Sequence, residues 1–225
     1  MADLYVRAQQ QNVGRGVDGT WLALRATRDG SPIVMPWVQA LVLEGRVFSI
    51  IGPEAATRTT TGMTLLALAS FGDDDETLYA DIPDGTAAIP LNVEARVQVS
   101  GGAVAHAYAF VTATLLGTGG TETACVIRNL RIDAPVTSGA TAAHTADSEV
   151  DHVTGTEVFL FRFVTTFDLD AAIGIDPGYT WSYGTNGYAP VALDASALCV
   201  SVVQTTSGTG WASLQWAELP ESAFT

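Results

Sequence analysis

The sequence predicts an all-β fold built as an antiparallel β-sandwich or barrel. Eight stretches show apolar and polar residues alternating with a period of two, which is typical of half-buried antiparallel strands. Turn-forming pairs such as Asp29-Gly30, Gly101-Gly102 and Asn186-Gly187 separate the stretches. No segment sustains the 3.6-residue period of an amphipathic helix. Short strands between glycine-rich turns indicate a sandwich or a barrel.

The eight expected strands follow one another along the whole chain. They are residues 21–27, 40–50, 91–99, 107–116, 124–132, 157–167, 197–204 and 211–219. The apolar run at 63–71 is ambiguous, because a short apolar run fits both a helix and a buried strand. The threonines before it and the GDDDE sequence after it favour a strand.

Two of these stretches predict which side chains share a face. In 91–99, Val93, Ala95, Val97 and Val99 alternate with polar residues and are expected to face the core together. In 157–167, the alternation puts the three phenylalanines on one face and Leu160 and Arg162 on the other. These phenylalanines are Phe159, Phe161 and Phe163.

The chain is expected to form one β-sandwich domain, residues 21–225, preceded by an extended arm, residues 1–20. The arm contains three consecutive glutamines and little apolar surface, so we expect it to be ordered only where a partner holds it. Two further stretches, 136–156 and 168–190, are rich in polar and turn-forming residues. Both are expected to be long exposed loops that carry contacts.

The charge of the chain argues against several classes of partner. The net charge is −14, all ten basic residues are arginine, and lysine is absent. Such a chain lacks the basic surface that binds nucleic acid or an anionic membrane. No apolar run is long enough to span a bilayer, and the polar N-terminus does not resemble a signal peptide. Residues 1–58 carry six of the ten arginines but only five of the 24 acidic residues, so they are nearly neutral.

The sequence offers no recognisable catalytic or metal-binding motif. It has no G-x-S-x-G motif, and no Ser or Cys lies beside a His in a recognisable frame, so we expect no enzyme activity. The acidic stretches at 73–76, 144–152 and 168–178 match no metal-site template, so no metal or cofactor is expected; a calcium ion held by one of these stretches is the alternative. Cys125 and Cys199 lie in apolar runs, which predicts two free buried thiols; a disulfide between neighbouring strands is the alternative.

Three segments resemble small structural proteins of tailed-bacteriophage virions. They are AQQQNVGRGVDGTW (8–21), ADIPDGTAAIPLNVEA (80–95) and GTGWASLQWAELP (208–220). The arrangement of strands and loops resembles the jelly-roll capsid decoration, or cement, proteins. This resemblance implies a jelly-roll-like sandwich, a homotrimer, the major capsid protein as partner, a location on the outer surface of the head, and no catalytic residues. Pro83 and Pro90 near expected strand ends also suit a jelly roll.

Two sets of residues are candidates for contacts. The first, in the nearly neutral N-terminal part, is expected to contact the capsid or a neighbouring subunit and comprises Arg7, Gln9, Gln10, Gln11, Arg15, Arg25 and Arg28. The alternative function is a tail or head-fibre module that recognises host glycans. In that case a set of aromatic residues would stack on sugars, and the nearby Asp176 and Asn186 would form hydrogen bonds with them. The alternative for the aromatic set is contact with the same or a neighbouring subunit. This set is Tyr179, Trp181, Tyr183 and Tyr188.

Overall fold

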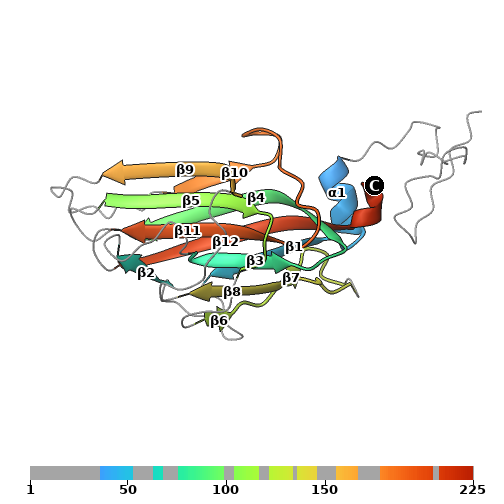
Figure 1. Ribbon diagram of the computed structural model, residues 1–225, viewed down its shortest axis with the longest axis horizontal. Helices are drawn as coiled ribbons and strands as arrows, with labels where there is room; N and C mark the ends of the chain where they lie inside the picture. Colours follow the sequence, from blue (N-terminus) through green and yellow to red (C-terminus); the bar gives the residue numbers. More distant parts are fainter. Residues whose placement is uncertain are drawn as a thin grey trace, which may run out of the picture.

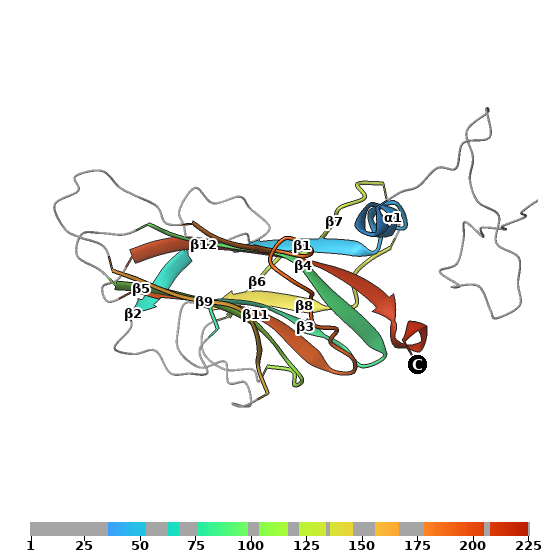
Figure 2. The same ribbon diagram turned by 90° about the horizontal axis from the view of Figure 1, so that it is seen from above.

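A computed structural model describes residues 36–52, 63–67, 76–98, 104–116, 122–133, 136–145, 156–166, 178–204 and 208–224. The expected arm and the expected strand at 21–27 lie outside the described residues. Within these ranges the protein consists of two β-sheets packed face to face, with an α-helix on the outer side of the first sheet (Figures 1 and 2). The all-β sandwich predicted from the sequence is confirmed.

Each sheet has four central strands. The first runs in the order β1 (Val47–Gly52), β12 (Gly208–Pro220), β4 (Thr86–Gln98) and β10 (Gly178–Ser182). The second runs in the order β3 (Leu78–Ile82), β11 (Ser196–Gln204), β5 (Val104–Thr112) and β9 (Val158–Thr166). Strand β2 (Met63–Ala67) pairs with β12 and with β11, so it joins the two sheets at one end of the molecule (Figure 2). The expected strand at 63–71 is therefore confirmed over 63–67.

The strand order is that of a jelly roll. Strand β1 pairs with β12, β3 with β11, β4 with β10 and β5 with β9, and all four pairs are antiparallel. The first four of these strands in the sequence therefore pair with the last four in reverse order. The pairs alternate between the sheets, because the β1 and β4 pairs lie in the first sheet and the β3 and β5 pairs lie in the second. Eight strands arranged this way in two sheets form a jelly roll. The more specific prediction of a jelly-roll-like sandwich is confirmed as well.

Three short strands lie between β5 and β9 in the sequence. Strand β7 (Arg128–Asn129) extends the first sheet beyond β1, and β8 (Thr141–Thr145) and β6 (Glu122–Ala124) extend the second sheet beyond β3. They therefore lie at the edge of the sandwich opposite to β9 and β10 (Figure 1). The expected continuous strand at 124–132 is wrong, because the chain leaves β6 after Ala124 and crosses to the other sheet at Arg128.

The main core lies between the two sheets, and its side chains follow the predicted alternation. In β4, Val93, Ala95 and Val97 are buried in this core while Glu94 and Arg96 on the opposite face are partly or fully exposed. The predicted face of this strand is confirmed for these residues. A smaller cluster beneath the helix, on the outer side of the first sheet, contains Leu41, Val47, Ile89, Leu91, Ala217 and Leu219.

The prediction of a strand at 40–50 is wrong over its first half. Residues Trp37–Leu43 form the helix α1, and β1 begins only at Val47. Gly45 adopts a left-handed φ of 72°, and its N–H donates to the carbonyl of Val42 while the Arg46 N–H donates to the carbonyl of Leu41. These two bonds form a Schellman C-cap, which ends the helix and turns the chain into the strand. No helix in the described ranges is long and apolar enough to cross a bilayer.

A bulge in β9 contradicts the prediction that three phenylalanines share one face. Phe161 lies opposite Ala109 of β5, but Phe159 lies opposite Phe110, so Leu160 is an extra residue. Phe161 is buried in the main core, whereas Phe159 lies on the outer face of the second sheet and contacts Phe110 with ring centroids 5.6 Å apart. One extra residue in an antiparallel strand reverses the side of all residues beyond it.

The two segments expected to be loops each contain a strand. The stretch 136–156 contributes β8, and the stretch 168–190 contributes β10, which pairs with β4 along its whole length. The rest of these two stretches includes residues 146–155 and 168–177, which lie outside the described residues. Neither cysteine forms a disulfide, as predicted, but only Cys199 is buried. Cys125, which lies just after the short strand β6, is half-buried.

Candidate functional site

The first predicted contact set lies before the described part of the chain. Arg7, Gln9, Gln10, Gln11, Arg15, Arg25 and Arg28 all lie outside the described residues, so their contacts stay predictions. The structure does define where this segment joins the fold, because residue 36 leads directly into α1. The helix lies at one end of the sandwich (Figures 1 and 2).

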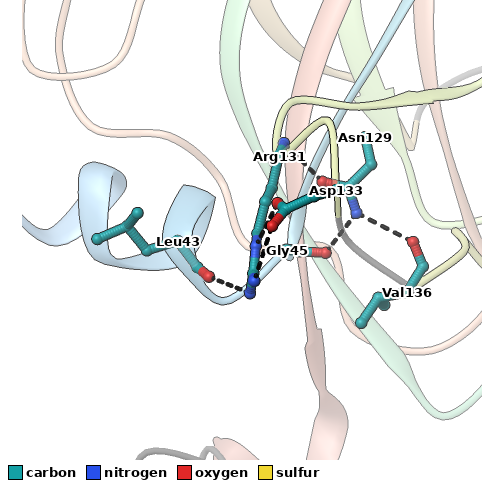
Figure 3. Close-up of polar contacts among 6 residues, drawn as sticks. All are labelled: Leu43, Gly45, Asn129, Arg131, Asp133 and Val136. Carbon is teal, nitrogen blue, oxygen red and sulfur yellow. Dashed lines mark hydrogen bonds and ion pairs between the residues drawn. The ribbon is translucent and has the colours of Figure 1, made fainter.

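The C-terminal end of α1 is held by Arg131, which follows β7. Its guanidinium donates a 2.8 Å hydrogen bond to the carbonyl oxygen of Leu43, a last-turn carbonyl that the helix itself leaves without a partner (Figure 3). The same guanidinium forms an ion pair with Asp133 at 2.9 Å. This hydrogen bond and the positive charge lower the pKa of Asp133. Arg131 thereby connects the helix to the β7 segment.

Asn129 completes this junction. Its side-chain amide donates to the carbonyls of Gly45, at 2.7 Å, and Val136, at 3.0 Å, and its Oδ1 accepts the N–H of Arg131 (Figure 3). Sequence reasoning missed both residues. The only signal was the Arg131-x-Asp133 spacing, which does not indicate a helix end 88 residues earlier in the chain.

Exposed apolar side chains surround this junction. They are Leu43, Leu130, Ile132 and Val136, and together we call them the α1-end patch. Ile132 is fully exposed, and the patch gathers one residue from α1 and three from the segment that follows β7. Clustered apolar side chains at the surface are typical of protein-binding sites. The patch lies at the C-terminal end of α1, the helix into which the N-terminal segment leads.

The structure divides the predicted aromatic set. Trp181 is 4% exposed and belongs to the main core, so it is not available to a surface ligand. Tyr179, on the same face of β10, stacks on Phe163 of β9 with ring centroids 5.0 Å apart and planes 13° apart. Only Tyr183 and Tyr188 are exposed, Tyr188 at 93%. Sequence reasoning missed the alternation of Tyr179 and Trp181, which is the signal of a strand.

A tight turn follows β10 and places the two exposed tyrosines. The Oδ1 of Asn186 accepts the N–H of Ser182 at 2.8 Å, and the Asn186 N–H donates to the Ser182 carbonyl. The side chain of Asn186 is therefore used to shape the turn, and the predicted partner Asp176 lies outside the described residues. Tyr183 packs against Trp37 of α1, with ring centroids 5.7 Å apart. The structure thus brings Tyr183 to α1 and leaves Tyr188 apart.

The outer face of the second sheet carries acidic groups around a small apolar cluster. The Asp81 carboxylate on β3 accepts a 3.0 Å hydrogen bond from the backbone N–H of Leu116, whose side chain belongs to that cluster. Burial, and the negative charge of Glu122, raise the pKa of Asp81 to about 6, although the hydrogen bond from Leu116 opposes the shift. Burial and a hydrogen bond with Glu122 raise the pKa of Tyr79. Of these groups, only Asp81 has a pKa that burial moves toward neutral pH.

A second polar cluster lies on the same sheet face. His106 Nδ1 and the hydroxyl of Tyr108 are 2.7 Å apart, and the guanidinium carbon of Arg162 lies 5.2 Å from the centre of the Tyr108 ring. Burial and the positive charge of Arg162 lower the pKa of His106. The contact of Arg162 with the Tyr108 ring joins β9 to β5 on this face.

Three carboxylates approach one another at the surface. Oxygen atoms of Asp84, Asp194 and Glu221 lie within 4.8 Å, and Asp194 has an unusual φ of 61°. The negative charge of Asp194 raises the pKa of Glu221. Carboxylate oxygens are the ligands that Ca²⁺ prefers, and these are the residues of the described chain that could hold such an ion. None of the three is buried, and exposed acidic groups of this kind are common without a metal.

Comparison with known proteins finds no relative. No protein-family model, curated protein or solved structure matches the chain.

Proposed function

We propose that the chain is a structural protein of a tailed-bacteriophage virion, and not an enzyme. In this proposal it is a capsid decoration protein that binds the outer surface of the head as a homotrimer and stabilises contacts between major capsid subunits. The observation that carries the proposal is the jelly-roll strand order, because jelly rolls are common in viral capsid and lectin domains. A fold alone does not define a function, so the surfaces must support it as well.

The charge distribution favours the outside of a head over its inside. Residues 59–225 contain 19 acidic residues and four arginines. A body this acidic is repelled by packaged DNA, which carries one negative charge for about every 1.7 Å of duplex. No nucleic-acid or membrane contact is part of the proposal.

The α1-end patch supports attachment at one end of the molecule. The nearly neutral segment 1–58 includes α1, and the proposed arm continues from the helix at the same end. An extended arm and an apolar patch that bind the same partner act as linked sites, so their contributions reinforce each other. The arginines of the arm are suited to pair with carboxylates of a capsid subunit.

Binding of a truncated protein to undecorated heads tests the proposal. Deletion of residues 1–19 should leave a folded β protein, because all described strands lie after this segment, and should strongly weaken binding to heads. Ile132→Ser in the full-length chain should weaken binding through the patch, while Ile51→Ser, an exposed apolar residue on β1, serves as the matched control. If neither the deletion nor Ile132→Ser changes binding, attachment at this end is wrong, and the stretches 136–156 and 168–190 become the better candidates.

Copy number in purified virions separates a head from a tail protein. A number in proportion to the major capsid protein supports decoration of the head. A number of only a few copies for each particle supports a tail role and contradicts the proposal.

The nearly complete exposure of Tyr188 supports a second candidate function, recognition of host glycans by a tail or head-fibre module. An exposed tyrosine offers a flat face on which a sugar ring stacks, and jelly rolls include lectin domains. Only Tyr183 and Tyr188 of the predicted aromatic set are exposed to take part. A glycan array tests this candidate: a hit that Tyr188→Ala abolishes supports it, and absence of any hit contradicts it.

A further inference from the structure

One long edge of the sandwich is formed by β9 and β10 (Figure 1). Among the described residues, β9 pairs only with β5, and β10 pairs only with β4. An edge strand offers unpaired N–H and C=O groups on one side, and these groups are a template for pairing with another chain. With nine residues, β9 is the longer of the two edge strands.

Strand β9 also exposes large apolar side chains. Val158 is 52% exposed, Phe159 50% and Phe163 43%. The bulge at Leu160 turns Phe159 to the outer face, while Phe163 stacks on Tyr179 of β10 in the facing sheet. Apolar surface therefore covers both sides of this edge. A long edge strand with exposed aromatic residues promotes association unless something covers it.

The charged residues at and next to this edge bear on which partner can cover it. Strands β5, β9, β10 and β11 contain no acidic residue, and their only charged side chain is Arg162, whose guanidinium lies over Tyr108. The whole chain has a net charge of −14, so two copies repel each other over most of their surface. The edge strands β9 and β10 themselves add no negative charge to this repulsion, although Glu157 directly precedes β9. The edge also lacks lysine, the usual guard against strand pairing, because the chain contains none.

We propose that the β9 edge, with Val158 and Phe159, is a subunit interface that a second copy of this chain covers. This inference rests on the homotrimer of the proposed function and names the surface through which it assembles. The interface is distinct from the α1-end patch, which lies at one end of the sandwich and beside the opposite edge (Figure 1). A protein with these two surfaces can bind its own copies and a capsid at the same time.

Sedimentation equilibrium of the full-length chain tests the interface. The variant Val158→Lys/Phe159→Ser places a charge and a hydroxyl on the edge without altering the buried Phe161 or the stacked Phe163. Wild-type protein should be a trimer at micromolar concentration, and the variant should need at least about tenfold higher concentration to associate. For a monomer–trimer equilibrium this is a hundredfold change in the association constant, or about 2.8 kcal/mol per trimer. The matched control is Ile132→Ser, which removes an exposed apolar side chain from the α1-end patch and should remain a trimer.

The outcomes distinguish this inference from the proposed function. A variant that associates as tightly as wild type overturns the β9 interface but leaves the trimer and head binding standing. A wild-type chain that is monomeric overturns the trimer and the interface together, and the head-binding assay still tests attachment separately. A monomeric variant supports the interface whether or not it binds heads.

Hydrogen exchange of the wild-type protein gives a second test that does not depend on a folded variant. Amides of β9 should exchange more slowly at a concentration where the trimer forms than at a dilution where it dissociates. The amides of β12, which lies inside its sheet between β4 and β1, should not change. Equal exchange of the β9 amides at both concentrations would contradict the interface.

Discussion

The indole N–H of Trp216 donates a 2.8 Å hydrogen bond to Oε1 of Glu218, two residues further along β12. Trp216 is the largest fully buried side chain in the described core, and Glu218 is buried as well. The same carboxylate accepts the hydroxyl of Ser138 and the N–H of Gly139, at 3.2 Å. Glu218 therefore connects the central tryptophan to the segment that leads into β8.

Removing this carboxylate should destabilise the fold. In Glu218→Ala the buried indole N–H of Trp216 and the backbone N–H of Gly139 lose their acceptor, and an unsatisfied buried donor costs about 1–3 kcal/mol. We expect the free energy of unfolding to fall by about 2 kcal/mol or more in urea denaturation. Glu218→Gln keeps one acceptor oxygen and should lose less.

The control for this prediction is Glu44→Gln. Glu44 is exposed and lies 3.8 Å from Arg46, so its loss should change the free energy of unfolding by less than about 0.5 kcal/mol. If Glu218→Ala and Glu44→Gln have equal effects, the carboxylate does not stabilise the core.

The Asp81 carboxyl should make stability depend on pH. Its pKa in the folded protein is about 6, above the ordinary value of about 3.9 in an unfolded chain. Between these values the folded state binds more protons than the unfolded state, so stability falls as the pH rises from about 4 to about 7. In Asp81→Asn, which still accepts the N–H of Leu116, this part of the pH dependence should disappear.

The measurement is the difference in urea midpoint between wild type and Asp81→Asn at several pH values. The difference is the informative quantity, because the general charge repulsion of an acidic chain also grows with pH and affects both proteins.

Asp133→Asn is the control, because the pKa of Asp133 is shifted in the opposite direction to that of Asp81. Arg131 lowers the pKa of Asp133, so the stability from that pair is present at neutral pH and is lost as the pH falls through the pKa. Identical pH profiles for wild type and Asp81→Asn would contradict the prediction.

The strands that could be predicted from the sequence are those with one face in the core and one in water. In β4, Val93 and Glu94 face opposite sides of the first sheet, so the period of two is visible in the sequence. The helix α1 could not be predicted in this way. It has only seven residues, and its end depends on the left-handed Gly45 and on Arg131, which is distant in the sequence.

The candidate surfaces were harder to predict than the strands, because strand pairing between distant parts of the chain decides which side chains are exposed. The aromatic residues of 168–190 looked alike in the sequence, but the pairing of β10 with β4 directs Trp181 into the core and leaves Tyr188 in solvent. Strict alternation would bury Phe159 with Phe161. A single inserted residue in β9, which no composition or period indicates, turns Phe159 outward and creates much of the exposed edge.

The two cysteines should differ in reactivity. Burial strongly raises the pKa of Cys199, and the negative charges of Glu76 and Asp81 add to the shift, so its thiolate is scarce and shielded. Cys125 is only half-buried. A thiol reagent should modify one thiol in the native protein and both after denaturation, and Cys125→Ser should remove the native reaction. Rapid native labelling of the Cys125→Ser variant would contradict the burial of Cys199.

The hydrogen bond from Arg131 to the Leu43 carbonyl should control the stability of α1. In Arg131→Ala the carbonyl of Leu43 in the last turn loses its donor from outside the helix, and the ion pair with Asp133 is lost with it. Without this bond the end of the helix should open more often, so the amides of Ala40 and Glu44 should exchange faster than in the wild type. Arg131→Lys should restore little, because an ammonium group cannot contact Leu43 and Asp133 in the geometry of a guanidinium.

The matched control for this junction is Arg96→Ala on β4. Arg96 also forms a surface ion pair with a nearby carboxylate, Glu94, at 2.6 Å, but it makes no contact with the helix. Exchange in α1 should be unchanged in this variant. If α1 presents the arm and the α1-end patch to a capsid, Arg131→Ala should also weaken binding to heads, because the helix would leave its bound position more often. Faster exchange in α1 with unchanged binding to heads would mean that the helix end stabilises the fold and takes no part in attachment.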